Sequence, residues 1–249
     1  EVVAINREEK QVEVHNLVNG ETCFLAYDKL ILSPGAKPIV PPFPGADLEG
    51  VCTLRNMPDM DVIKGRIDSG GVKSAVIVGG GFIGLEMAEN LTERGVEVTV
   101  VEMLDQVIAA LDYEMAAMLH RHLQDNGVRL RLGDGLKEIL AVEGGRMKAI
   151  LSSGKSIEGD MVILAIGVRP VSDLAKQAGL ELGPRRHIAV DEYMRTSDPD
   201  IYAVGDVIQV KNPITGAMTA VPLAGPANRQ ARVAADHITG QRYGNLSNM

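Results

Sequence analysis

The stretch from residue 72 to residue 102 constrains the fold of this chain more than any other. A run of small and β-branched apolar residues, 74–78, leads into a Gly-x-Gly-x-x-Gly turn made by Gly79, Gly81 and Gly84. A helix is expected over residues 82–94, and Gly95 is suited to end it. A second β-branched run follows at 96–101. Strand, turn, helix and strand in this order predict a parallel βαβ unit.

The three glycines have separate physical roles. Gly79 permits the tight turn, Gly81 lets the backbone come close to a pyrophosphate, and Gly84 lets the helix pack against the strand. The N–H groups at the helix start, including that of Ile83, and the positive end of the helix dipole point at the same phosphates. Glu102 stands 18 residues after Gly84, where a carboxylate accepts hydrogen bonds from both hydroxyls of an adenosine ribose. The pattern predicts a dinucleotide site, and the alternative is a glycine-rich loop that only packs a helix.

Glu102 also bears on which dinucleotide binds. Its carboxylate would repel the 2′-phosphate of NADPH, and a site for NADPH normally supplies a nearby arginine. The next four residues, 103–106, contain no cation. The sequence therefore favours NADH over NADPH.

The composition excludes several classes of partner. The chain has 249 residues, of which 45% are apolar and 23% charged, and a net charge of −8. This is ordinary for a globular protein of one large or two modest domains. The negative charge argues against a nucleic-acid or anionic-membrane surface. The longest apolar run, 161–168, is far shorter than the ~18 residues of a membrane helix, so we expect no membrane span.

The cysteines and histidines do not indicate a metal or redox centre. Cys23 and Cys52 are not spaced as a Cys-x-x-Cys pair or as zinc ligands. We expect both to be small buried residues of a protein in the reducing cytoplasm. The five histidines are scattered, and His120 and His122 stand two apart on an expected helix, which points them to different faces. No metal is expected.

A proline-rich segment marks the best domain boundary. Residues 1–33 are typical of a small β unit, and four prolines and a glycine between residues 38 and 45 forbid a helix. We divide the chain into residues 1–50, 51–168 and 169–249. For the central segment the pattern predicts an α/β fold, a parallel sheet with helices on its faces and a three-stranded antiparallel excursion.

Two later strands also end in glycine. Residues 161–166 lead to Gly167, and the apolar strand within residues 196–207 leads to Gly205 and Asp206. Glycine at the carboxyl end of a strand allows a ligand to approach closely in the crevice of a doubly wound sheet. A plain strand-end turn explains Gly167 equally well, and Asp206 is either an ordinary cap or a ligand for a sugar hydroxyl.

These three glycine-terminated strands, in this order and spacing, resemble those of the two-dinucleotide flavoprotein disulfide reductases, the pyridine nucleotide-disulfide oxidoreductase family. The branch is that of coenzyme A-disulfide reductase, NADH oxidase and NADH peroxidase. Residues 27–38 resemble the segment that leaves the FAD domain, 53–59 the start of the NADH domain, and 196–207 the FAD-binding strand. The resemblance implies a Rossmann-like NAD(P)-binding domain inserted in a partial FAD-binding domain.

The resemblance implies roles that the residues alone leave open. Phe82 would be the aromatic lid over the nicotinamide pocket, Glu86 would lie near the nicotinamide and the reactive edge of the flavin, and Gly167 would contact NADH. Without the family, Phe82 is by default a packing aromatic and Glu86 a surface carboxylate. On the FAD side the implied residues, with Asp206 at the ribityl chain and the pair 223–224 by the pyrimidine edge, are Gly35, Gly205, Asp206, Leu223 and Ala224.

The chain departs from the family pattern at both ends. It has neither the FAD Gly-x-Gly-x-x-Gly and the redox cysteine that follows it nor the carboxyl-terminal interface domain of ~100 residues. We expect the central part of a longer cytoplasmic homodimer that passes hydride from NADH to FAD and on to a disulfide or cysteine-based acceptor. The small-molecule acceptor would be a disulfide, a peroxide or oxygen. No catalytic residue is expected in this part, because the redox cysteine would precede Glu1. It should bind NADH without turnover. The alternatives are an NADH oxidase, peroxidase or ferredoxin-reductase-like flavoprotein and a non-catalytic nucleotide-sensing module.

Overall fold

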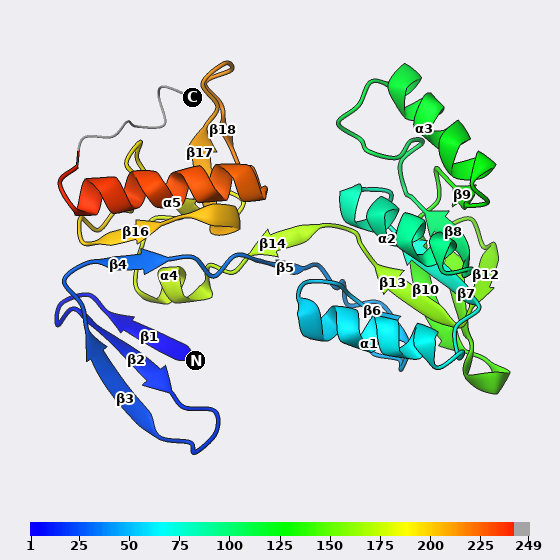
Figure 1. Ribbon diagram of the computed structural model, residues 1–249, viewed down its shortest axis with the longest axis horizontal. Helices are drawn as coiled ribbons and strands as arrows, with labels where there is room; N and C mark the ends of the chain where they lie inside the picture. The colour runs from blue at the N-terminus through cyan, green and yellow to red at the C-terminus, as the bar shows by residue number, and fades with distance from the viewer. Residues whose placement is uncertain (242–249) are drawn as a thin grey trace. The chain divides into compact units, whose positions relative to one another are not determined.

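The computed structural model describes residues 1–241, which form two compact units (Figure 1). The Rossmann unit is Pro38–Arg169, and the flanking unit combines Glu1–Lys37 with the chain from Pro170 onward. The expected division after residue 50 falls inside the Rossmann unit. There the Gly50 carbonyl accepts a hydrogen bond from the Val162 N–H (3.0 Å), and the next strand joins the central sheet.

The Rossmann unit is built on a five-stranded parallel sheet in the order β6-β13-β7-β8-β9. Its strands are β6 (Val51–Cys52), β7 (Ser74–Val78), β8 (Glu97–Val101), β9 (Arg129–Arg131) and β13 (Met161–Leu164). The two central strands, β13 and β7, are almost wholly buried. Continuous β-branched runs suit this position, because a parallel sheet is covered on both faces. The predicted parallel βαβ unit is confirmed.

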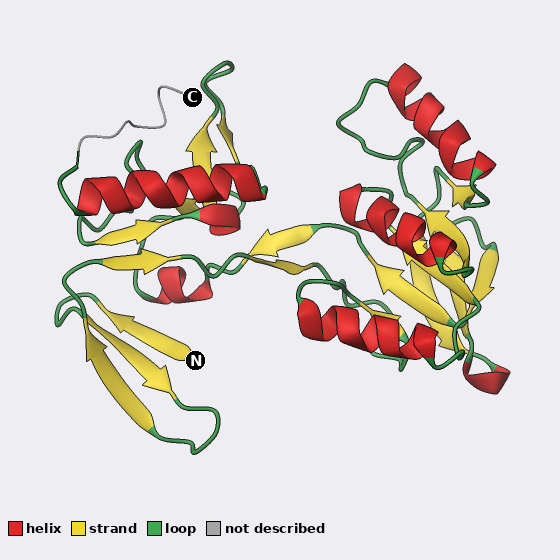
Figure 2. Ribbon diagram, viewed as in Figure 1, coloured by secondary structure: helices red, strands yellow, loops and turns green. Residues whose placement is uncertain are grey.

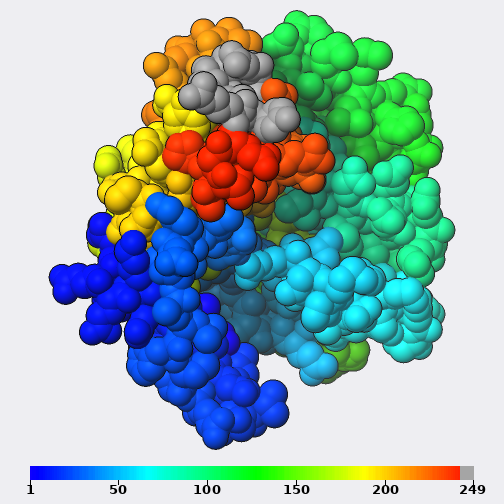
Figure 3. Space-filling model, turned by 60° about the vertical axis from the view of Figure 1, so that its left-hand side comes forward, coloured from blue at the N-terminus to red at the C-terminus, as the bar shows by residue number. Residues whose placement is uncertain are grey.

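Three helices cover one face of this sheet (Figure 2). They are α1 (Met57–Asp68), α2 (Phe82–Glu93) and α3 (Tyr113–Asp125). Ile63 of α1, Leu91 of α2 and Leu123 of α3 share a buried cluster with alternate residues of β7, β8 and β13. The Asn56 side chain caps α1 in a reciprocal capping box with Asp59. Most other side chains of α1 are exposed, and the helix lies at the surface in Figure 3.

The antiparallel excursion covers the other face. It consists of β10 (Leu136–Ala141), the 3₁₀ turn η1 (Glu143–Gly145), β11 (Met147–Leu151) and β12 (Ser156–Gly159). Ile139, Met147 and Leu151 are buried against Val76 and Val162 of the parallel sheet. The helices and the excursion therefore divide the two faces between them. The third antiparallel strand, β12, has only one long apolar side chain, so its range was not evident from the sequence.

Asp160 ties the start of β7 to the start of β13. Its Oδ2 accepts hydrogen bonds from the N–H groups of Lys73 (3.0 Å) and Ser74 (2.8 Å) and from the Ser74 hydroxyl (2.8 Å). Its Oδ1 lies 3.2 Å from Nε of Arg146. Burial raises the pKa of Asp160, but the hydrogen bonds from Lys73 and Ser74 and the Arg146 charge outweigh it, so the pKa lies below the usual aspartate value.

Because folding lowers this pKa, the stability that Asp160 supplies is present above the unfolded pKa of about 3.9 and is lost as pH falls through the folded value. Asp160→Asn should lower the free energy of unfolding at neutral pH by about 1–3 kcal/mol. The variant should also lose less of its free energy of unfolding than wild type when the pH is lowered. Urea unfolding at neutral pH and at about pH 3 checks both, with Asp61→Asn, exposed on α1, as the control. An unchanged acid dependence in Asp160→Asn would contradict this role.

The flanking unit holds short elements around its own core. Its strands and helices are β1 (Val2–Asn6), β2 (Gln11–His15), β3 (Thr22–Ala26), β4 (Leu30–Leu32), α4 (Asp173–Gln177), β15 (Ile188–Ala189), β16 (Ile201–Ala203), η2 (Gly205–Val207), β17 (Ile208–Lys211), β18 (Met218–Thr219) and α5 (Ala224–Ile238). β1–β3 form an antiparallel sheet, and β4 pairs with β16 in parallel. The short strands β5 (Ala36–Pro38) and β14 (Val168–Pro170), where the chain passes between the units, pair with each other. None of the helices described here is long and apolar enough to cross a membrane.

Candidate functional site

The three sequence features of the predicted dinucleotide site lie at one edge of the parallel sheet. Gly79 directly follows β7, Glu102 directly follows β8, and Gly167 lies just beyond β13. These strands are neighbours in the order β13-β7-β8, so their carboxyl ends stand side by side. This edge is where open α/β sheets bind their ligands.

The first and last glycines of the turn are required by the fold itself. Gly79 has φ +112°, and a Cβ there would lie 2.3 Å from the carbonyl oxygen of Ala165. A Cβ on Gly84 would lie 2.0 Å from the carbonyl oxygen of Gly79 and 3.4 Å from Cγ2 of Ile77. The predicted turn at Gly79 and the predicted close packing at Gly84 are confirmed.

Gly81 differs from both, because nothing in the protein needs it to be glycine. It has an ordinary φ of −82°, and a Cβ there would meet no atom within 4 Å. Gly81 is the N-cap of the twelve-residue helix α2. Within residues 1–241, the N–H groups of Gly81, Phe82 and Ile83 have no acceptor. The open space and the free donors stand where a pyrophosphate would bind.

The Glu102 carboxylate holds the turn in place. Its Oε2 accepts the N–H of Gly80 (2.7 Å) and its Oε1 accepts the N–H of Leu104 (2.8 Å). A carboxylate has about four acceptor positions, so lone pairs remain for a ribose diol. A Cβ on Gly80 would lie 3.2 Å from Cβ and Cγ of Glu102. The sequence assigned no role to Gly80, because it occupies a variable position of the Gly-x-Gly-x-x-Gly pattern.

Phe82 and Glu86 lie at the surface of α2. Phe82 is 70% exposed and Ile83 is 38% exposed, and Glu86 is exposed with no ion pair in the described range. Phe82 therefore does not serve as a packing aromatic. Both Phe82 and Glu86 border a groove of about 450 Å³ between α2 and α3, which Leu85 and Leu119 also line. Their role at a nicotinamide stays a prediction.

Gly167 has φ +112°, and its carbonyl accepts the N–H of Ile39 (3.0 Å). Gly167 is exposed, so the turn is open to a ligand, but its contact with NADH also stays a prediction.

In the flanking unit, a buried glutamine holds the turn that presents Asp206. Gly205 has φ +81°, and its N–H donates to Oε1 of Gln230 on α5 (2.8 Å). Gln230 is only 3% exposed, whereas Asp206 is half-buried. Gln230 was missed from the sequence, since a glutamine inside a helix is usually a surface residue. The other residues predicted to contact FAD are Gly35, with φ +72°, and the exposed pair Leu223 and Ala224 at the start of α5.

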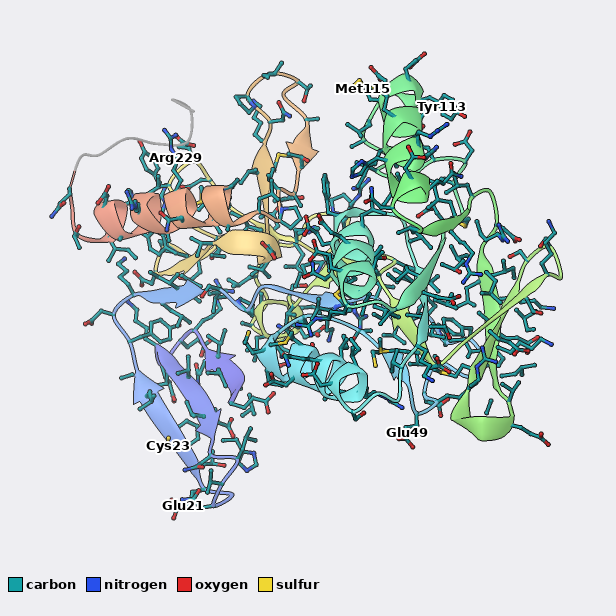
Figure 4. All side chains as sticks on the ribbon, turned by 45° about the vertical axis from the view of Figure 1, so that its right-hand side comes forward. Glu21, Cys23, Glu49, Tyr113, Met115 and Arg229 are labelled. Carbon is teal, nitrogen blue, oxygen red and sulfur yellow. The ribbon has the colours of Figure 1, made fainter. Side chains whose placement is uncertain are left out.

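One of the two cysteines is not buried as expected. Cys23 is exposed on β3, an edge strand of the β1–β3 sheet (Figure 4), so its predicted burial is wrong. Cys52 is half-buried, and burial raises the pKa of its thiol although Arg66 opposes this, which keeps it protonated at neutral pH.

His120 contacts the backbone of Val107 and His122 borders the α2/α3 groove, so their predicted separation is confirmed. No cluster of three potential metal ligands occurs among the described side chains.

The strand order, the glycine turn and the acid at the next strand end define a Rossmann-type α/β protein. The pattern of the family described as pyridine nucleotide-disulphide oxidoreductase matches residues 1–231. The chain belongs to this family, and the predicted family and α/β fold class are confirmed.

Named relatives agree with this assignment. The chain is 42% identical over 223 residues to an NADH oxidase of Methanocaldococcus jannaschii, covering 89% of this chain and 49% of that protein. It is 34% identical over 242 residues to a coenzyme A disulfide reductase of Staphylococcus haemolyticus, covering 97% and 53%. The crystal structure of reduced Bacillus anthracis CoADR-RHD matches with a TM-score of 0.95 and 52% identity, over 99% of this chain and 44% of that one. The chain thus spans about half the length of the curated relatives it matches.

Proposed function

We propose that the Rossmann unit binds NADH at the carboxyl edge of its parallel sheet. The pyrophosphate would lie against Gly81 and the first N–H groups of α2, and the adenosine ribose against Glu102. The observation that carries this proposal is the contrast among the glycines. Gly79 and Gly84 are explained by protein contacts, but Gly81 faces open space beside unpaired donors, which a ligand that needs close approach explains.

The whole protein is proposed to be a flavoprotein oxidoreductase that takes electrons from NADH. Bound FAD would supply the hydride acceptor, and in the flanking unit Asp206, Gly205, Gly35 and the start of α5 would hold part of it. The names of the relatives, an NADH oxidase and a coenzyme A disulfide reductase, support oxygen or a small disulfide as the final acceptor, with a peroxide as a further candidate. We also propose a homodimer for the whole protein.

Two measurements on the purified chain test this proposal. Titration with NADH, followed by the change in nicotinamide fluorescence, should saturate at one NADH per chain. The visible absorbance spectrum should show little retained FAD and the NADH turnover should be negligible, because the 249 residues contain no second Gly-x-Gly-x-x-Gly. Absence of NADH binding would overturn the site, and stoichiometric FAD with rapid NADH oxidation would overturn the expectation of inactivity.

Glu102 should set the preference between the two nicotinamide cofactors. Glu102→Arg should weaken NADH binding about tenfold and improve NADPH binding, because it replaces the ribose acceptor and the charge that repels a 2′-phosphate with a cation. Glu102→Ala should relax the preference without reversing it. Both variants also lose the acceptor for the Gly80 N–H. Parallel titrations with the two cofactors measure the preference, and Asp105→Ala, exposed three residues later, is the control.

Equal affinity of the unmodified chain for NADH and NADPH would contradict this role for Glu102 while leaving the site itself in place.

A further inference from the structure

We infer that His120 is a positioning residue for the proposed NADH site. It holds the segment between β8 and α3, residues 103–112, against the glycine turn through a bond that exists only while the imidazole is neutral. This inference rests on the proposed function and adds a residue from outside the glycine motif. A chain of three hydrogen bonds inside the Rossmann unit links His120 to Glu102.

The first bond joins α3 to the segment. Nε2 of His120 accepts the backbone N–H of Val107 at 3.1 Å. Val107 is fully buried, and its side chain belongs to the main core of the Rossmann unit. The ring of Tyr113, at the start of α3 (Figure 4), lies edge-on to the His120 ring with centroids 6.4 Å apart. The imidazole therefore has a hydrogen-bond donor at Nε2 and an aromatic ring edge-on to it.

The second bond joins the segment to the glycine turn. Ile108 donates its N–H to the carbonyl of Gly80 at 2.9 Å. Ile108 has φ +46°, a conformation that a β-branched residue adopts only when its surroundings hold it there. A Cβ on Gly80 would lie only 3.0 Å from Cγ1 of Val107. Val107 and Ile108 therefore both contact the glycine turn at Gly80.

The third bond reaches the carboxylate at the proposed ribose site. The Gly80 carbonyl accepts the N–H of Ile108, and the Gly80 N–H donates to Oε2 of Glu102. Gly80 also directly precedes Gly81, at the proposed pyrophosphate site. If Nε2 of His120 can no longer accept, the hydrogen bond to the Val107 N–H is lost. That bond holds the backbone next to the strained residue Ile108. The position of Gly80, and with it the spacing between Gly81 and Glu102, then becomes less well defined.

Protonation of the imidazole would have the same effect as removing it. A ring nitrogen accepts the Val107 N–H only when it carries no proton, and the imidazolium has donors at both nitrogens. In the described range His120 forms no ion pair, and Tyr113 of its own helix is the titratable group in ring contact with it. The charged residues of the two elements that meet at His120 are exposed: Asp105 and Asp112 on the segment, and Glu114, Arg121 and Asp125 on α3. Arg121 is paired with Asp125.

The test measures NADH affinity of the whole chain between about pH 5.5 and pH 8, the range in which a histidine titrates. The wild-type dissociation constant should rise about two- to tenfold toward the acid end, the value of one net hydrogen bond. His120→Leu should bind NADH more weakly than wild type by a similar factor at pH 8, and its NADH affinity should not depend on pH in this range. His120→Gln, whose amide oxygen accepts a hydrogen bond at any pH, should bind NADH as tightly as wild type at pH 8. Its NADH affinity should also not depend on pH. His122→Gln, on the same helix facing the α2/α3 groove, should keep the wild-type profile.

A binding-independent readout separates this inference from the proposed function. In the wild type and in His122→Gln, the amide NMR signal of Val107 should differ between pH 8 and about pH 5.5, because the hydrogen bond to Nε2 needs a neutral ring, and in His120→Gln it should not. If the wild type binds no NADH, the proposed site fails and the Val107 signal still decides the role of His120. If NADH binds but His120→Leu matches wild type across the pH range, or if the Val107 amide signal is the same in the wild type and in His120→Gln at every pH, the inference is overturned.

Discussion

Replacing Gly81 with alanine is expected to weaken NADH binding at least tenfold while leaving the fold intact. The new methyl group would enter the open space beside the first N–H groups of α2, where the pyrophosphate is proposed to lie. The free energy of unfolding should stay within about 1 kcal/mol of wild type. Alanine is a poorer N-cap than glycine, but it also lowers the entropy of the unfolded chain, and these two effects oppose each other.

Titration with NADH and urea unfolding of the same preparation measure the two expectations separately. Gly65→Ala, at an open position within α1, is the matched control for adding a methyl group to a helix of the same unit, and it should not change NADH binding. If Gly81→Ala binds NADH as tightly as wild type, no ligand approaches this residue closely and the proposed pyrophosphate position is wrong.

The part of the fold that the sequence predicted well is the part in which local pattern and tertiary environment agree. β7, α2 and β8 lie where they were expected, because a fully buried parallel strand requires an unbroken apolar run and a turn into a helix requires glycine at Gly79. The helix expected around His120 and His122 is also present, as α3.

The elements that the sequence did not reveal are very short. α4 has five residues, and β15 and β18 have two each, too few to show any periodicity. The division after residue 50 was misplaced because the proline-rich segment looks like a linker. In the structure, Phe43 and Leu48 pack against the core of the Rossmann unit. Pattern alone cannot show such packing.

The same distinction applies to the site. Glu102 was identified by its distance from the glycine turn, but its bond to Gly80 was not, because Gly-x-Gly-x-x-Gly gives that position no role. His120 accepts the N–H of Val107, 13 residues before it, and Gln230 accepts the N–H of Gly205, 25 residues before it, and only these hydrogen bonds reveal the two residues. Cys23 lies within a run of apolar residues, but β3 is exposed along its whole length, so an apolar pattern alone overestimated its burial.

Replacing Gly84 with alanine is expected to have the opposite effect to Gly81→Ala, with a loss of about 3 kcal/mol or more in the free energy of unfolding. The added Cβ would lie 2.0 Å from the carbonyl oxygen of Gly79. That oxygen belongs to the backbone of a buried turn and cannot rotate away as a side chain can. Either α2 moves outward or the turn after β7 distorts, and both changes disturb the core that Leu91 and Ala88 form with the sheet.

Urea unfolding followed by circular dichroism measures this loss, and amide exchange of Ile77 and Val100, which face each other on β7 and β8, assigns it to the Rossmann unit. Gly65→Ala should instead be neutral or stabilising by up to about 1 kcal/mol, since it replaces glycine in a helix without a clash. Unfolding of Gly84→Ala within 1 kcal/mol of wild type would show that α2 is not held by this contact. Because α2 carries the proposed phosphate donors, Gly84→Ala should lose stability and NADH affinity together, whereas Gly81→Ala should lose affinity alone. That difference separates the glycine the fold needs from the glycine the ligand needs.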